Sequence, residues 1–419
     1  MLKTFNFEKL PIVEIVNEII IDATKNRASD IHIDPFNDVL KIRIRIDGTL
    51  IDYATVPNDY KKNLVTRIKI IAGMNITENR LPQDGAIKTS LNGIPLDMRV
   101  SSLPTNNGEK IVIRILDYSM SIQGLEQLGF TKDNFEKIMK MINLPNGIIL
   151  VTGATGTGKS TTVYSILQRL NREEANVITV EDPVEMDIPG VNQVQVNSEI
   201  GLTFANVLRS ILRQDPDIIM IGEIRDDETA TIAVRASVTG HLVLSTIHTN
   251  NSLNTIERLL DMEVERYLLA ASLSGIISQK LARKLCPHCR KKITPTPYEK
   301  YLFKKNLGID LNEIYVAGDG CDNCMNGYRG RIAIHEVLLI DEDIRDAISN
   351  NIRKEELRKL VYSENVHTLL QDGLIKVAQG LTSFEEIIKL IELDVEDIVI
   401  PKGENAENNN VQDSNVEQK

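Results

Sequence analysis

GATGTGKSTT spans residues 153–162 and follows directly on an apolar run, GIILVT, at 147–152. In this pattern the glycines let backbone N–H groups surround a phosphate, the lysine (Lys159) reaches the β- and γ-phosphates, and the neighbouring hydroxyl (Ser160) binds Mg²⁺. A Gly-rich surface turn is the alternative, but the strand-like run before the loop and the helix-spaced apolar residues after it favour a phosphate loop. We therefore predict that a nucleoside triphosphate is bound by Gly153, Ala154, Thr155, Gly156, Thr157, Gly158, Lys159, Ser160 and Thr161.

The chain around this loop alternates between short apolar runs and segments with helical spacing, which is typical of a parallel sheet flanked by helices. The strands that we expect are 147–152, 177–181, 218–222 and 242–248. In such α/β sheets the ligand-binding side chains gather at the carboxyl ends of the strands. Candidate catalytic residues are therefore sought at those ends.

Glutamates follow two of these strands, Glu181 after NVITV and Glu223 after DIIMIG. A site that cleaves a phosphate needs carboxylates for the metal and for the attacking water. We expect the two glutamates to share these roles, and which of them is the general base stays open. Solvated carboxylates at strand ends are the alternative. His248 is expected to sense the γ-phosphate, whereas His241, at the far end of the strand HLVLSTIH, is either structural or at an interface.

The first part of the chain has the pattern of an antiparallel sheet. LKIRIRI at 40–46 alternates apolar and cationic residues, as in a strand with one buried face. LDMRVSSLPTNNGEKIVIRIL at 96–116 predicts a hairpin in which Arg99 and Arg114 stand opposite each other on the polar face. Like charges in that position repel, and an anion relieves the repulsion, so we expect arginine fingers that contact a γ-phosphate. A solvated pair beside an acidic residue is the alternative.

The four cysteines form two C-x-x-C pairs, CPHC at 286–289 and CDNC at 321–324. Four thiolates complete the tetrahedral coordination of Zn²⁺, which makes a structural site with no open position. We therefore predict that Cys286, Cys289, Cys321 and Cys324 bind zinc. His288 is a possible substitute ligand, and disulfides, an iron–sulfur cluster or unliganded thiols are the alternatives.

Composition narrows the possible functions. The chain is 42% hydrophobic and 26% charged, has no Trp, and carries a formal net charge of −11, which argues against direct nucleic-acid binding. Its start resembles no signal peptide, and no apolar run is long enough to cross a bilayer. A cytoplasmic protein is expected, with any membrane association made through a partner.

Changes of pattern along the chain predict the domain boundaries. They separate an N-terminal α+β domain at 1–117, a linker at 118–130, an ATPase core at 131–285, a tetracysteine zinc subdomain at 286–330, a C-terminal helical region at 331–400 and a disordered tail at 401–419.

Taken together and in this order, the motifs resemble those of the type II secretion and type IV pilus assembly ATPases, over about residues 10–395. The matching stretches are ASDIHIDP, RIRIDG, RLPQDGAI, DMRVSSLPT, GEKIVIRIL, GATGTGKSTT, ITVEDPVE, LRQDPDIIMIGEIRD, TGHLVLSTIHTN, the two C-x-x-C pairs and DGLIKVAQGLTS. The resemblance implies a RecA-like P-loop motor domain preceded by a mobile, PAS-like domain. It also implies a homo-hexameric ring that hydrolyses ATP and drives an inner-membrane platform protein, which inserts or extrudes pilin subunits.

Two features bear on which member of that group the chain resembles. Many secretion members carry a further N-terminal docking domain, and this chain starts almost at the helix before ASDIHIDP, which favours a pilus or competence system. Retraction ATPases generally lack the tetracysteine insert, so assembly is favoured over retraction. A retraction or DNA-translocating motor remains an alternative, as does a zinc-ribbon binding module whose nucleotide only switches its shape.

Overall fold

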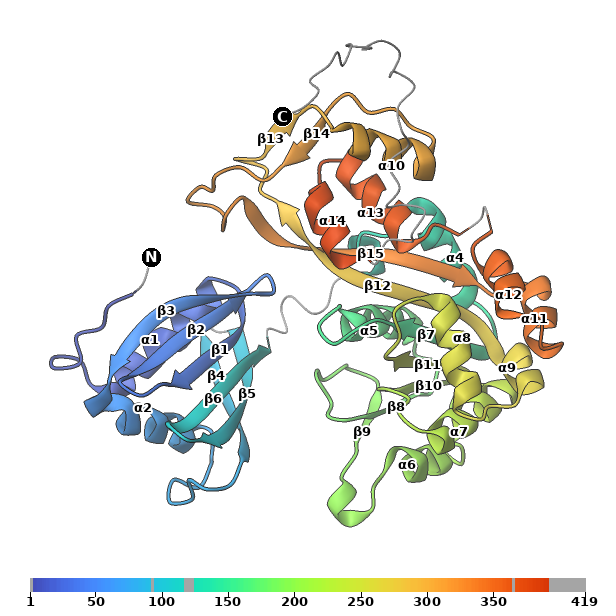
Figure 1. Ribbon diagram of the computed structural model, residues 1–419. Coiled ribbons are helices and arrows are strands. Elements are labelled where there is room, and N and C mark those ends of the chain that lie inside the picture. Colours follow the sequence, from blue (N-terminus) through green and yellow to red (C-terminus); the bar gives the residue numbers. More distant parts are fainter. Residues whose placement is uncertain (1–2, 92–93, 117–123, 364–365, 392–419) are drawn as a thin grey trace, which may run out of the picture. The chain divides into compact units, whose positions relative to one another are not determined.

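The computed structural model describes residues 3–91, 94–116, 124–363 and 366–391 (Figure 1). Its contacts divide the chain into two compact units. The larger unit comprises Met1–Lys284 and Arg329–Leu369, and the smaller one comprises Leu285–Tyr328 and the described chain from Leu370 on. The predicted linker lies partly, and the predicted disordered tail wholly, outside the described residues.

The N-terminal part of the larger unit is a six-stranded antiparallel sheet in the order β3-β2-β1-β6-β5-β4. Two helices, α1 and α2, pack against it and against each other. The elements are α1 (Ile12–Lys25), β1 (Ala28–Pro35), β2 (Val39–Ile46), β3 (Thr49–Pro57), α2 (Asn58–Ile71), β4 (Gln83–Leu91), β5 (Ile94–Thr105) and β6 (Gly108–Leu116).

Alternation of side chains builds the core of this sheet. In β2, Leu40, Ile42 and Ile44 are buried while the intervening cationic residues are only partly covered. On α1, apolar residues at helical spacing, Ile15 and Ile19 among them, are buried. The helices thus cover the apolar face and leave the charged face open.

The second sheet has seven strands in the order β15-β12-β7-β11-β10-β8-β9 (Figure 1). Strands β12, β7, β11, β10, β8 and β9 pair in parallel, each with its neighbour. The bounds are β7 (Gly147–Thr152), β8 (Val177–Glu181), β9 (Asn192–Gln195), β10 (Ile218–Ile221), β11 (Leu242–Ile247), β12 (Leu273–Leu285) and β15 (Tyr328–Leu339). The α/β class with a parallel sheet, predicted above, is confirmed.

Both faces of this sheet are covered by helices. Ile148 and Leu150 of β7 point into a core that contains α6, α7, α8 and α9, whereas Ile149 and Val151 point into a core that contains α4 and α5. The helices are α4 (Lys132–Ile142), α5 (Lys159–Leu170), α6 (Phe204–Ile211), α7 (Asp227–Val238), α8 (Ser252–Asp261) and α9 (Arg266–Ser272). Burial on both faces explains why β7, β8, β10 and β11 are predominantly apolar runs.

Three strands of this sheet were not predicted from the sequence: β9, β12 and β15. Residues 331–339 belong to β15 and not to the predicted helical region. Residues 334–338 of β15 are buried on both faces, and periodicity alone does not separate such a strand from a buried helix. The helices of that region begin later, as α11 (Glu342–Ser349), α12 (Lys354–Val361), α13 (Leu369–Ala378) and α14 (Phe384–Leu390).

The smaller unit combines α13 and α14 with the cysteine-containing segment. That segment contributes a two-stranded sheet of β13 (Lys291–Ile293) and β14 (Ile314–Val316), and the helix α10 (Pro297–Leu307). Thr296 and Glu299 form a capping box at the start of α10. Across the residues that the structure describes, no helix has both the length and the apolar content needed to cross a membrane.

Candidate functional site

The phosphate loop connects β7 to α5, the strand–loop–helix setting that the motif requires. Gly153 has φ +150°, and a Cβ there would lie 2.6 Å from the carbonyl oxygen of Gln279, so only glycine fits. Gly158, at φ 88°, directly precedes α5. The amino end of α5 therefore faces the loop, where its dipole favours an anion.

Lys159 is folded back over the loop. Its Nζ donates to the carbonyl oxygens of Gly153 at 2.8 Å and Ala154 at 3.1 Å. Burial lowers the pKa of Lys159, and the negative charges of Glu223 and Glu185 oppose that shift. A phosphate at the loop would supply the anion that the buried ammonium lacks.

Glu223 lies two residues after the end of β10, and two side chains, those of Arg225 and His248, contact it. Arg225 donates a hydrogen bond to its Oε1, and His248 Nε2 lies 3.4 Å from its Oε2. The hydrogen bond from Arg225 is the main cause that lowers the pKa of Glu223, and the charges of Arg225, His248 and Lys159 act in the same direction. Glu223 is therefore ionised at neutral pH, as a proton acceptor must be.

Glu181 is buried at the end of β8 and its carboxylate is surrounded by donors. It accepts hydrogen bonds from Tyr164, from Thr179 Oγ1 at 2.6 Å and from Gln193 Nε2 at 3.0 Å. The same Gln193 nitrogen donates to the carbonyl oxygen of Met186. These contacts tie the segment after β8 to α5 and occupy the carboxylate that the sequence suggested for metal or water.

The two histidines have different surroundings. His248, next to the end of β11, contacts Glu223 as described. His241, just before β11, has Nδ1 2.8 Å from the carbonyl oxygen of Ala236 at the end of α7. That contact supports the structural alternative for His241.

Arg99 and Arg114 lie on the six-stranded sheet. They are direct partners across β5 and β6, so the predicted register is confirmed. Arg114 also pairs with an acidic residue, since its Nε lies 3.1 Å from Asp30 Oδ1. An acidic neighbour was part of the alternative given above, yet Arg114 remains well exposed, with 62% of its side chain accessible.

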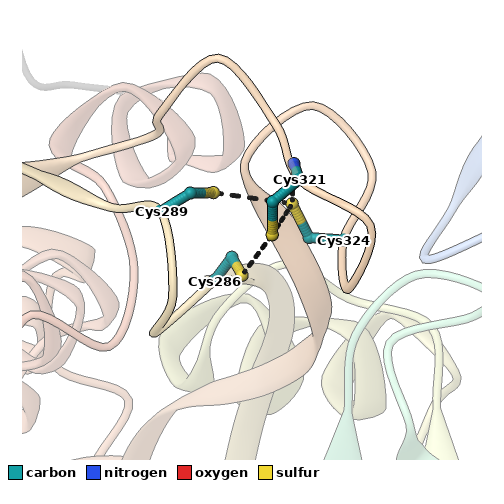
Figure 2. A group of neighbouring side chains, drawn as sticks. All are labelled: Cys286, Cys289, Cys321 and Cys324. Atoms are coloured by element: carbon teal, nitrogen blue, oxygen red, sulfur yellow. Dashed lines mark hydrogen bonds between the residues drawn. The ribbon is translucent and has the colours of Figure 1, made fainter.

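The four cysteines meet in the smaller unit, as Figure 2 shows. Their Sγ atoms all lie within 4.8 Å of one another, and neighbouring pairs are 3.5 to 3.8 Å apart. A disulfide needs about 2.05 Å, so none of these pairs is one. Sulfurs around a tetrahedral zinc, at about 2.3 Å from the metal, are roughly 3.8 Å apart. The thiols therefore fit a single metal ion.

Glycines let the two cysteine loops approach each other. A Cβ on Gly318 would lie 1.9 Å from the carbonyl oxygen of Cys289, and one on Gly327 would lie 2.6 Å from that of Gly318. The backbone N–H of Cys286 also donates to Gly327 across the gap. His288 is not part of the metal-binding group that the described residues form.

Three further residues that were not predicted act on the phosphate loop, Glu223 or Lys159: Gln279, Arg225 and Glu185. Gln279, on β12, donates to the carbonyl oxygen of Thr157 at 2.9 Å and accepts from Thr162 at 2.8 Å. Its strand was itself not predicted, so no sequence signal pointed to it. Arg225 and Glu185 stand in the stretches GEIRD and VEDPVE, where their charge next to Glu223 and Glu181 was a usable signal.

A phosphate loop between strand and helix, with a glutamate after another parallel strand of the same sheet, defines the class of P-loop ATPases. Comparisons with known proteins identify the family within that class. The profile of the family "Type II/IV secretion system protein" matches residues 6–389. The chain therefore belongs to this family and is an ATPase.

Similarity to individual proteins supports the same family. Type II secretion system protein E of Dickeya dadantii is 45% identical over 91% of this chain and 76% of its own length. The type IV pilus assembly ATPase PilB of Thermus thermophilus is 45% identical over 90% of this chain and 42% of its own length. Among solved structures, the pilus retraction motor PilT with bound ADP has a TM-score of 0.62 at 27% identity, covering 93% of this chain and 99% of its own.

Proposed function

We propose that this protein is an ATP-hydrolysing motor that powers the assembly of type IV pili or of the related pseudopili of type II secretion or competence systems. The observation that carries the proposal is the identity of 45% to both an assembly ATPase and a secretion protein E over most of this chain. The retraction motor PilT is a more distant relative, at 27%. Assembly is therefore favoured over retraction.

In this proposal ATP and Mg²⁺ bind at residues 153–161, with Lys159 on the β- and γ-phosphates and the Ser160 hydroxyl on the metal. Glu223 is the general base that orients and activates the attacking water. His248 contacts Glu223 at 3.4 Å and links it to the γ-phosphate position. Glu181 has a structural role and holds the segment after β8 in place, because three hydrogen-bond donors already contact its carboxylate.

Arg99 and Arg114 are the proposed arginine fingers. They are cross-strand partners on the charged face of the six-stranded sheet, and Arg99 also donates a hydrogen bond to the carbonyl oxygen of Val184 at 2.9 Å. In a homo-hexameric ring with head-to-tail contacts, they contact the γ-phosphate on a neighbouring subunit, so that hydrolysis moves one subunit against the next.

Cys286, Cys289, Cys321 and Cys324 would hold a structural Zn²⁺. The ion would stabilise the smaller unit by joining its two cysteine loops. Four thiolates leave no coordination position for a substrate, so the site has no part in hydrolysis.

The partners follow from the proposed role. The ring would act in the cytoplasm, at the cytoplasmic membrane, on an inner-membrane platform protein, and pilin subunits would be moved only indirectly. With a net charge of −11, direct nucleic-acid binding is not expected.

Two measurements test the proposal. Lys159→Ala should abolish ATP binding and hydrolysis by the purified protein. Deleting the gene should remove surface filaments or secretion, and the Lys159→Ala gene should not restore them. Loss of filament retraction with assembly intact would contradict the proposed direction of the motor, and DNA-stimulated hydrolysis would point to a translocase.

A further inference from the structure

The two arginines are part of a row of charges that crosses the six-stranded sheet. The cross-strand partners run from Arg45 on β2 to Asp30 on β1, then to Arg114 on β6 and Arg99 on β5. The next partner, on β4, is Ala86. Three cations and one carboxylate thus share one row of the charged face. Asp30 is the only acidic member of this row.

Asp30 is buried, with 7% of the residue exposed, and it is engaged by both flanking arginines. Its Oδ1 lies 3.1 Å from Nε of Arg114, and its Oδ2 lies 3.7 Å from Nε of Arg45. The hydroxyl of Ser29 donates to Oδ2 at 2.8 Å. A carboxylate held from these sides has a fixed position, so it is a rigid anchor for Arg114.

The atom that Asp30 engages decides how Arg114 can be used. A guanidinium carries donors on Nε and on two terminal nitrogens. Because Asp30 pairs with Nε of Arg114, the two terminal nitrogens remain to bind an anion. Together they can donate two parallel hydrogen bonds to it. The negative charge also reduces the repulsion between Arg114 and Arg99. Without Asp30 the flexible Arg114 side chain would swing away from its like-charged neighbour.

We propose that Asp30 is a positioning residue for ATP hydrolysis. It pairs with Nε of Arg114 and so orients the terminal nitrogens of Arg114, beside Arg99, for contact with the γ-phosphate. The inference rests on the proposed arginine-finger role. It assigns a function to a buried acidic residue on β1, a strand that is far from the phosphate loop in the sequence.

Asp34, on the same strand, is a matched control. It is also buried, at 5% exposed, and also holds two cations, Arg43 at 2.8 Å and Lys110. Neither cation is a proposed finger. Asp34→Asn therefore removes the same kind of charge and hydrogen bonds without touching Arg114.

The test compares full-length Asp30→Asn, Asp34→Asn, Arg114→Ala and the double variant Asp30→Asn/Arg114→Ala for ATPase rate, affinity for a non-hydrolysable ATP analogue, and Tm. Asp30→Asn is expected to lower kcat roughly 10-fold or more, since small misplacements of a positioned group can cost up to about 100-fold. Analogue affinity should match wild type, and Asp34→Asn should keep its kcat. The double variant should be no slower than Arg114→Ala, because Asp30 acts through that residue.

The outcomes separate this inference from the proposed function. If Arg114→Ala keeps wild-type kcat, the finger role fails and the inference fails with it. If Arg114→Ala is slow but Asp30→Asn matches Asp34→Asn, or if the losses in the double variant add, only the inference is overturned. Should Asp30→Asn not fold, Asp30→Glu keeps the charge and shifts the carboxylate by one methylene; it is expected to lower kcat at unchanged affinity, and wild-type kcat would overturn the inference.

Discussion

Glu223 is the residue on which the chemistry of the nucleotide site is expected to depend. It is the glutamate near both Lys159 and His248, and its carboxylate is partly open, whereas Glu181 is buried among donors. Replacing it by an isosteric amide removes the proton acceptor and keeps the shape. Glu223→Gln should therefore retain ATP and lose hydrolysis by about 100-fold or more.

Glu181→Gln is the matched variant for that measurement. It places an NH₂ group where one of the three donors now points, so it should lower the free energy of unfolding by roughly 1–3 kcal/mol. Single-turnover hydrolysis and denaturant unfolding of both variants check this. Hydrolysis lost with Glu181→Gln but kept with Glu223→Gln would reverse the assignment of the base.

Arg225 sets the acidic limit of activity if Glu223 is the base. Its hydrogen bond is the largest cause that lowers the pKa of Glu223 from 4.5. A base works only above its pKa, so the wild-type rate should fall with decreasing pH only below about 4.5. Arg225→Gln raises the pKa and should move the acid limb of kcat/KM to higher pH.

The measurement is a pH–rate profile of wild type, Arg225→Gln and a control, Arg169→Gln on α5, which breaks an exposed ion pair with Glu126. The control should leave the limb in place. An unchanged limb in Arg225→Gln would show that Glu223 is not the group that titrates.

At the scale of single residues, the sequence predicted the features that depend only on the spacing of residues within one short segment. The phosphate loop and the facing of Arg99 and Arg114 follow from a few consecutive positions, and the register is confirmed. The hydrogen bonds that hold Glu181 come from Tyr164, Thr179 and Gln193, which three separate segments bring together. Such a network depends on packing between elements, which spacing within one segment does not reveal.

At the scale of elements, strand β15 is joined to helix α8 by a buried glutamate. Glu336 is 2% exposed, and its Oε1 accepts a hydrogen bond from the backbone N–H of Ser252, the first residue of α8, at 2.8 Å. Burial raises the pKa of Glu336. Without this acceptor a buried N–H loses its partner, and such a loss costs roughly 1–3 kcal/mol.

Glu336→Ala should therefore lower the free energy of unfolding by at least that amount, and urea denaturation measures it. Glu355→Ala, at an exposed position on α12, is the control and should stay near wild type. Equal stability of Glu336→Ala and wild type would mean that β15 is held to α8 by other contacts.

The cysteine cluster is the element whose stability should depend on a metal. Sulfur spacings of 3.5 to 3.8 Å fit one tetrahedral ion, and structural zinc contributes on the order of 10 kcal/mol to small sites. A strong chelator, or Cys321→Ser, should lower Tm by several degrees, and added Zn²⁺ should reverse the effect of the chelator. Metal analysis should find one zinc per chain. Unchanged melting after complete loss of metal would contradict a structural site.

The sequence predicted four strands of the parallel sheet, because each is a short apolar run followed by polar residues. It did not reveal β12 or β15. Both are long and buried on both faces over much of their length, so neither shows the alternation that marks a half-exposed strand. Gln279 was missed for the same reason, since its contact with the phosphate loop depends on the position of β12.

At the scale of the whole molecule, the proposed motor combines features on two different sheets. The phosphate loop, Glu223 and His248 lie at the carboxyl ends of the parallel strands, and the arginine pair lies on the antiparallel sheet. We propose that a complete ATP site uses the first set from one subunit and the second set from its neighbour. Subunits defective in different sets should then complement each other.

Mixing purified Lys159→Ala protein with Arg114→Ala protein tests whether neighbouring subunits share the site. In a mixed ring, an Arg114→Ala subunit still has its phosphate loop, and a neighbouring Lys159→Ala subunit still has its arginines, so some sites are complete. We expect the mixture to hydrolyse ATP several-fold faster than the sum of the separate proteins. A rate equal to that sum, in rings shown to contain both variants, would contradict a shared site.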